Sequence, residues 1–266
     1  MAYPGRHDIV DTLPICSERG PERIRMTGPR NASLIEFLRA RLSFDGYLGL
    51  HLTVGVLVLI VSALIFGHIA EDVVNADAIT VLDVRLSQWF HVRATPLPTR
   101  AVLLFTHVHS TVGILALSSL LALYWMRMKA WDWLLTLALT VPLGMLLNVL
   151  LKNIFQRARP VFDVPLLSLS SYSFPSGHAA GATLFYGLLA AWFIGRTTSW
   201  RWRAVIALAG ALMVALVGLS RIYLGVHYLS DVLAAIAASG CWLAFSLTAV
   251  DTSRRRRLSP DRRSEA

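Results

Sequence analysis

The sequence predicts an all-α polytopic membrane protein with six transmembrane helices, of which helices 4 to 6 form a tight core. Of the 266 residues, 55% are hydrophobic and only 15% are charged, whereas soluble domains carry about 25% charged residues. The mean hydropathy is +0.57. About 20 helical residues are needed to cross the apolar layer of a bilayer. Six stretches of 17 to 26 residues lack Asp, Glu, Lys and Arg, namely 47–70, 101–126, 133–151, 179–195, 204–220 and 232–250.

The segments before the first span are polar. Residues 1–33 are rich in Pro, Gly and Arg, which predicts a disordered tail. Residues 34–44 have amphipathic helical spacing and are expected to lie flat on the membrane surface. We therefore place one six-helix membrane domain over 34–250. The two cysteines, Cys16 and Cys241, are too few and too far apart for a disulfide framework or a metal cluster.

The connection 71–100 separates the first two spans. It is acidic at its start and amphipathic from Ile79 to Val92. This pattern favours a short helix on the outer surface, with Trp89 and Phe90 at the membrane interface. A solvated connecting loop is the alternative.

Small residues recur in the last spans. Ala207, Ala211 and Ala215 follow one another at four-residue spacing in the fifth span, with Gly210 and Gly218 on a nearby face. Small side chains let helices approach closely in lipid. Together with the alanine-rich sixth span, they predict the tight core of helices 4 to 6.

Lysine and arginine are unevenly divided between the two sides of the predicted bundle. Eighteen of the 25 lie in the two tails and in the connections 127–132 and 196–203, and seven lie on the other side. The positive-inside rule therefore places both termini in the cytoplasm, including a basic tail at 251–266. Orientation and anionic headgroups account for the net charge of +9, and this distribution argues against a nucleic-acid partner.

Three polar clusters adjoin the ends of the spans. They read K-N-I-F-Q-R-A-R-P at 152–160, P-S-G-H at 175–178 and S-R-I-Y-L-G-V-H-Y-L-S-D at 220–231. Because spans 3 and 5 run outward and spans 4 and 6 run inward, all three clusters are expected on the outer side. Strongly hydrated groups are costly near hydrocarbon, so their convergence indicates a functional site.

The cations of these clusters suit a phosphate group. Arg159 and Arg221 offer planar guanidinium forks, and Lys152 offers a point charge. Ser176 and Gly177 precede the fourth span, where backbone N–H groups at the positive end of a helix bind anions. The pattern predicts a phosphate-binding pocket.

Two histidines and a carboxylate suit phosphoryl transfer. His227 and Asp231 are four residues apart, hence on one helical face. The carboxylate can fix the imidazole tautomer and leave the other nitrogen free to attack phosphorus. His178 can protonate the leaving alkoxide, and the cations can stabilise charge on the phosphoryl oxygens. Each cluster alone also has an ordinary explanation, as a flanking anchor, a helix cap or a structural hydrogen bond.

Taken together, the three clusters resemble the signatures of the type-2 phosphatidic acid phosphatase family, K-x6-R-P, P-S-G-H and S-R-x5-H-x3-D, without any departure. The resemblance implies a membrane lipid phosphate phosphatase with His227 as nucleophile, Asp231 as its orienting partner and His178 as acid and base. It also implies a metal-independent enzyme without cofactors. The implied phosphate binders are Lys152, Arg159, Ser176, Gly177 and Arg221.

Two further functions are alternatives to hydrolysis of a membrane lipid phosphate on the extracytoplasmic side. A phosphotransferase would use the same site with an acceptor hydroxyl in place of water. An anion transporter would use the same cations, but no charged residue lies deep in any predicted span. The sequence leaves open the lipid, the choice between monophosphate and pyrophosphate, the oligomeric state, and the roles of His107, His109 and Arg157.

Overall fold

The computed structural model describes residues 50–258, and this part of the chain contains helices and no strand. The predicted tail 1–33, the predicted surface helix 34–44, Cys16 and the end of the basic tail lie outside the described residues. The helices are α2 (Leu50–Asn75), α3 (Ala78–Arg93), α4 (Pro96–Val108), α5 (Thr111–Arg127), α6 (Trp131–Phe155), α7 (Gly177–Ile194), α8 (Trp200–Tyr223) and α9 (Leu229–Leu258). The all-α prediction is confirmed.

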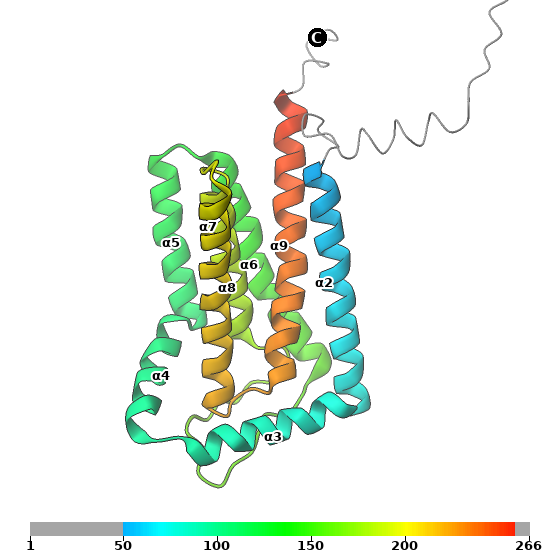
Figure 1. Cartoon of the computed structure of the whole chain (residues 1–266), viewed down its shortest axis with the longest axis vertical. Coiled ribbons are helices and arrows are strands. Elements are labelled where there is room, and N and C mark those ends of the chain that lie inside the picture. Colours follow the sequence, from blue (N-terminus) through cyan, green and yellow to red (C-terminus); the bar gives the residue numbers. More distant parts are fainter. Residues whose placement is uncertain (1–49, 259–266) are drawn as a thin grey trace, which may run out of the picture. The chain divides into compact units, whose positions relative to one another are not determined.

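The long helices run side by side, and α3 lies across one end of them (Figure 1). Within the described range, five helices are long and apolar enough to cross a membrane, or six if the bent pair α4 and α5 counts as one span. This agrees with the six predicted spans. Several helices extend beyond the uncharged stretches of the sequence. In particular, α9 continues past residue 250, where Arg254 and Arg255 both pair with Asp251 at 2.9 and 2.7 Å.

The predicted second span, 101–126, is broken in two. The axes of α4 and α5 differ by 50°. Ser110 begins the new helix, because its hydroxyl accepts a hydrogen bond from the Gly113 N–H at 3.2 Å, which is the usual work of an N-cap serine. A side chain at Gly113 would collide with the carbonyl group of Val108. The expectation of one continuous helix is therefore wrong.

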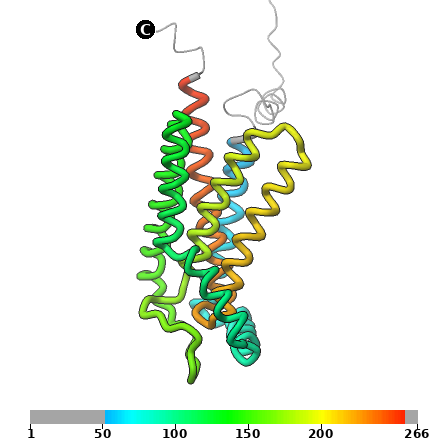
Figure 2. Tube along the Cα trace, turned by 90° about the vertical axis from the view of Figure 1, so that its left-hand side faces the viewer, coloured from blue at the N-terminus to red at the C-terminus, as the bar shows by residue number. Residues whose placement is uncertain are grey.

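Helix α3 confirms the predicted helix over 79–92 and excludes the loop alternative. It buries two polar side chains and leaves several apolar ones exposed, although Leu86 and Phe90 pack against the core. Asp83 and Ser87 are buried, whereas Val81 and Leu82 are about half exposed. An exposed apolar face suits the lipid interface, and the buried polar face brings Asp83 to the ends of α8 and α9, which α3 contacts (Figures 1 and 2).

The core of the bundle extends beyond the predicted spans 4 to 6, which are α7, α8 and α9 in the structure. A buried apolar cluster does join α7, α8 and α9, namely Ala179, Ala180, Ile222, Val232 and Ala235. The largest buried apolar cluster instead lies among α5, α6 and α7. Its members are Ile114, Trp125, Leu137, Val141, Met145, Leu184, Phe185, Leu188 and Trp192.

Close packing of α8 uses its glycines and not its alanine stripe. A side chain on Gly218 would lie 2.5 Å from Val232 in α9, so these helices approach closely there. Ala207, Ala211 and Ala215 are exposed. The predicted role of the three alanines in the core is therefore wrong, because α8 turns them away from α7 and α9.

Candidate active site

His227 and Asp231 lie where the chain enters α9. Gly225 has a φ of +66°, and a side chain there would also lie 2.7 Å from the ring of Phe162. Glycine is therefore suited to this turn. The turn brings His227 Nδ1 to 3.4 Å from Asp231 Oδ2, and both side chains are buried, with exposed fractions of 2% and 0%. The structure thus brings the predicted pair together.

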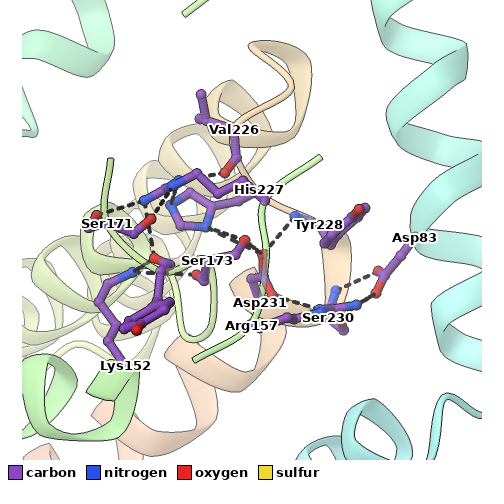
Figure 3. A network of polar contacts seen from close by, with 12 residues as sticks. Asp83, Lys152, Arg157, Ser171, Ser173, Val226, His227, Tyr228, Ser230 and Asp231 are labelled. Carbon is purple, nitrogen blue, oxygen red and sulfur yellow. Dashed lines mark hydrogen bonds and ion pairs between the residues drawn. The ribbon is translucent and has the colours of Figure 1, made fainter. Parts of the chain in front are cut away.

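Asp231 has three further partners besides His227 (Figure 3). Its Oδ2 accepts a hydrogen bond from the backbone N–H of Tyr228 at 2.9 Å and a short one from the hydroxyl of Ser173. Its Oδ1 accepts from Arg157 Nη1 at 2.7 Å. Ser173 was not identified from the sequence, because it lies in an irregular connection with no motif spacing to mark it. The carboxylate is held from both sides.

Arg159 contacts the other side of the His227 ring. Its Nη1 lies 3.2 Å from His227 Nε2 and donates to the carbonyl oxygen of Val226 at 2.6 Å. A guanidinium can only donate, so Nε2 accepts in this contact and Nδ1 carries the ring proton toward Asp231. This is the tautomer in which Nε2 keeps the lone pair needed for attack on phosphorus.

The charge state of His227 follows from its surroundings. Removal from water is the largest effect and lowers the pKa of His227 to about 4, while Asp231 opposes it and the charges of Arg159 and Lys152 add to it. Burial also lowers the pKa of Arg159, against the charge of Asp231. At neutral pH the imidazole is therefore uncharged, as a nucleophile must be.

The end of α6 delivers the first group of predicted phosphate binders. Gln156 adopts a left-handed conformation (φ 47°, ψ 31°) and ends the helix, so Lys152 lies in the last helical turn and Arg159 in the connection that follows. Lys152 Nζ donates to the carbonyl oxygen of Tyr172 at 2.6 Å. Lys152, Arg159 and Arg221 lie close enough to act on one another's charges. Such a concentration of cations favours an anionic ligand.

Arg221 and Ser176 have buried polar atoms without partners. Arg221 is 1% exposed, and its Nη1 donates to the hydroxyl of Thr106 at 2.7 Å. Within residues 50–258, Arg221 Nε and Nη2 and the hydroxyl of Ser176 make no hydrogen bond. Buried polar groups are nearly always bonded, so these three donors mark a place for an acceptor-rich ligand.

The start of α7 differs in part from the expected anion site. The hydroxyl of Ser176 makes no cap hydrogen bond, so it is not used as an ordinary N-cap. The backbone N–H of Ser176 donates to the carbonyl oxygen of Asp231 at 3.0 Å, so the predicted use of this N–H for an anion is wrong. The N–H groups of Gly177 and His178 in the first turn have no acceptor within the helix.

His178 lies at the same end of the bundle as His227. Arg221, His227 and Arg159 are all near enough to act on its charge. His109, in the break between α4 and α5, is also near, but both of its ring nitrogens are engaged. They contact the carbonyl oxygen of Phe105 and the hydroxyl of Tyr186, each at 2.8 Å. His107 is exposed on α4.

Arg157 stands apart from the other cations. Its Nη1 donates to Asp231 and to the hydroxyl of Ser230, both at 2.7 Å, and its Nη2 donates to Asp83 at 2.8 Å. Its terminal nitrogens therefore bind two carboxylates and are not available to bind a phosphate group. Asp83 was not identified from the sequence. The available signal was that it is the single acidic residue of the amphipathic stretch 79–92.

A cavity of about 610 Å³ adjoins Lys152 and Gly177. Its polar lining includes Thr111, Asn148, Asn153, Ser170, Ser171 and Tyr172, and Met145, Leu146 and Val149 of α6 supply an apolar side. Leu146 and Val149 are about half exposed on the outside of the bundle. The cavity therefore joins Lys152 to the lipid-facing surface. In the described part of the chain, no three His, Cys, Asp or Glu side chains gather closely enough to hold a metal ion.

Comparisons with known proteins show which family the chain resembles. Residues 133–255 match the sequence model of the PAP2 superfamily. The chain is 34% identical over 177 residues to phosphatidylglycerophosphatase B of Bacillus subtilis (strain 168), which covers 65% of this chain and 85% of that protein. The crystal structure of a transmembrane PAP2-type phosphatidylglycerolphosphate phosphatase from Bacillus subtilis superposes with a TM-score of 0.64 at 28% identity, over 77% of this chain and 98% of the other. The structure of Aquifex aeolicus LpxE shares the fold, with a TM-score of 0.50 at 24% identity, over 62% of this chain and 94% of the other.

Proposed function

The chain belongs to the PAP2 superfamily and is a membrane lipid phosphatase, and we propose that it hydrolyses its substrate through a phosphohistidine on His227. One observation carries the proposal. Three buried donors on Arg221 and Ser176 have no partner. Arg221 is near enough to act on the charges of Lys152 and His178, and His227, whose attacking nitrogen keeps its lone pair, also acts on the charge of His178. Phosphoryl oxygens supply the acceptors that these donors lack.

The steps use residues of this chain only. The bound phosphate anion offsets the cations around His178 and so favours its protonated form. His227 Nε2 attacks phosphorus as the bond from phosphorus to the lipid oxygen breaks, and protonated His178 gives its proton to that oxygen. Neutral His178 then takes a proton from a water molecule, whose oxygen attacks the phosphohistidine and releases inorganic phosphate. His227 and protonated His178 are regenerated. Lys152, Arg159 and Arg221 stabilise the charge on the phosphoryl oxygens throughout.

We place this site on the extracytoplasmic side. The support is the excess of Lys and Arg in the tails and in the connections at the opposite end of the spans. The lipid tails stay in the bilayer while the headgroup occupies the cavity beside Lys152, whose lining also includes the apolar Met145, Leu146 and Val149. Phosphatidylglycerol phosphate is the first substrate to test, because the Bacillus subtilis relative is a phosphatidylglycerophosphatase.

Phosphate release in detergent tests the substrate class. The panel compares phosphatidylglycerol phosphate, phosphatidate, undecaprenyl pyrophosphate and lipid A, each with EDTA present. We expect turnover of at least one lipid, unaffected by EDTA, with one inorganic phosphate released for each lipid product formed. Transfer of the phosphoryl group to an alcohol without free phosphate would contradict hydrolysis, and a requirement for added magnesium would contradict the metal-free mechanism.

Acid–base stability of the intermediate tests the role of His227. A ³²P-labelled substrate should leave label on the wild-type protein after a rapid quench, stable in alkali and lost in acid. His227→Ala should give no label and no turnover. His107→Ala, which changes an exposed histidine on α4, is the matched control and should behave as wild type. Substantial turnover by His227→Ala would refute the mechanism.

A further inference from the structure

Asp83 is a fully buried carboxylate that reaches the site from α3. Its Oδ1 accepts a hydrogen bond from the backbone N–H of Ser230 at 2.9 Å, and its Oδ2 accepts a short one from the hydroxyl of the same serine. Oδ2 also accepts from Arg157 Nη2 at 2.8 Å. A buried charge is retained only with partners of this kind. Figure 3 shows Asp83 on the far side of Arg157 from Asp231.

Arg157 is the link between the two carboxylates. Its two terminal nitrogens each lie within 2.8 Å of one of them, and its guanidinium carbon lies 4.4 Å from the ring centre of Tyr228. Burial alone would lower the pKa of Arg157, but the charges of Asp231 and Asp83 and the hydrogen bonds to them outweigh burial and raise it. Arg157 is therefore a permanent cation beside the carboxylate that orients the nucleophile.

A single cation in this position would work against catalysis. When His227 attacks phosphorus its ring becomes positively charged, and Asp231 must stabilise that charge. Arg157 competes with the ring for the same carboxylate. Asp83 neutralises Arg157 from its other side, so the three groups together keep one net negative charge facing His227.

We propose that Asp83 is a positioning residue for phosphoryl transfer, which balances Arg157 so that Asp231 keeps its negative charge for His227. This inference rests on the proposed function of His227. It assigns a role to the interfacial helix α3, whose exposed apolar face and buried carboxylate otherwise have no common explanation. Asp83 touches neither phosphate nor the imidazole and acts through Arg157.

A double-variant cycle tests the proposal in the full-length protein, with phosphate release from phosphatidylglycerol phosphate as the assay. Asp83→Asn leaves Arg157 uncompensated, and we expect kcat to fall about tenfold or more with KM changed less than about threefold. Asp83→Asn combined with Arg157→Met removes both charges, so kcat should rise at least about fivefold above that of Asp83→Asn alone. Asp77→Asn, on the exposed carboxylate that precedes α3, is the control and should match wild type.

A merely structural ion pair gives the opposite pattern. The losses in kcat from the two substitutions would then add, so a double variant no more active than Asp83→Asn would overturn the proposal. A change in KM alone for Asp83→Asn, or no change in either constant, would also overturn it. If Asp83→Asn does not fold in detergent, the double variant decides alone. A kcat within about thirtyfold of wild type supports the proposal, and a larger loss overturns it.

His227→Ala in the same panel separates two failures. Activity in that variant would refute the function proposed for His227, whatever Asp83 does. An inactive His227→Ala together with Asp83 variants that match Asp77→Asn would refute only the role of Asp83.

Discussion

Lowering the pH from 7 to 5 is expected to leave the attacking form of His227 almost unchanged. Burial sets its pKa at about 4. At pH 6 about 1% of such a histidine is protonated, compared with about 75% of an ordinary imidazole with a pKa of about 6.5. The acid limb of kcat/KM, which reports free enzyme, should therefore lie near pH 4.

The assay is kcat/KM for phosphate release between pH 3.5 and 8 in detergent micelles. The phosphate group of the substrate also titrates, at about pH 6 for a monoester, so its ionisation is measured separately in the same micelles and divided out. Quenched single turnovers with ³²P-labelled substrate provide a second reading, because they follow label on His227 directly. Circular dichroism at each pH separates loss of fold from loss of chemistry.

An acid limb centred near pH 6.5 after this correction would refute the inference that burial keeps His227 neutral. The same shift predicts a stability effect of definite sign. A histidine with a depressed pKa stays neutral in the folded protein while the unfolded chain takes up a proton, so stability is full above about pH 6.5 and falls as the pH drops toward 4. The loss in the free energy of unfolding is on the order of 3 kcal/mol. It should be absent from His227→Ala, and thermal unfolding midpoints of both proteins measured across this pH range test it.

Three other substitutions have defined outcomes. Ser173→Ala removes a hydroxyl donor to the Asp231 carboxylate, and because hydrogen bonds to charged groups contribute about 1.5–3 kcal/mol, kcat should fall about tenfold to a hundredfold with KM little changed in steady-state assays. Thr106→Val removes the acceptor for Arg221 Nη1 and should weaken product inhibition by inorganic phosphate about tenfold; unchanged inhibition would show that Thr106 does not orient the guanidinium. Gly225→Ala places a side chain at positive φ and 2.7 Å from an aromatic ring. It should cost about 1–3 kcal/mol, seen as a lower unfolding midpoint, and an unchanged midpoint would mean that the turn relaxes freely.

The residues that converge on the site were visible in the sequence because each lies beside an uncharged run. His227 and Asp231 share a helical face by spacing, and alternation of the spans brings Lys152 and Arg221 to one end of the bundle. These inferences need only the length and direction of helices. They do not depend on how any connection folds.

The residues that were missed depend on connections. Asp83 reaches Arg157 across 74 residues of sequence, and nothing in the local pattern of α3 shows that its polar face turns inward. Ser173 belongs to an irregular segment. The break at Ser110 had a local signal, a serine followed three residues later by a glycine. The signal lies inside an uncharged stretch, and hydropathy does not report helix caps.

The contact between Arg159 and His227 has a consequence for selectivity. The Nε2 lone pair of His227 accepts a hydrogen bond from the guanidinium of Arg159 at 3.2 Å, so it is not free to react while this contact is in place. A phosphate-bearing lipid brings oxygens that attract the same guanidinium more strongly than a ring nitrogen does. In the proposed mechanism, the phosphate that draws Arg159 away from Nε2 is also the group that His227 attacks, and a lipid without phosphate leaves this hydrogen bond in place.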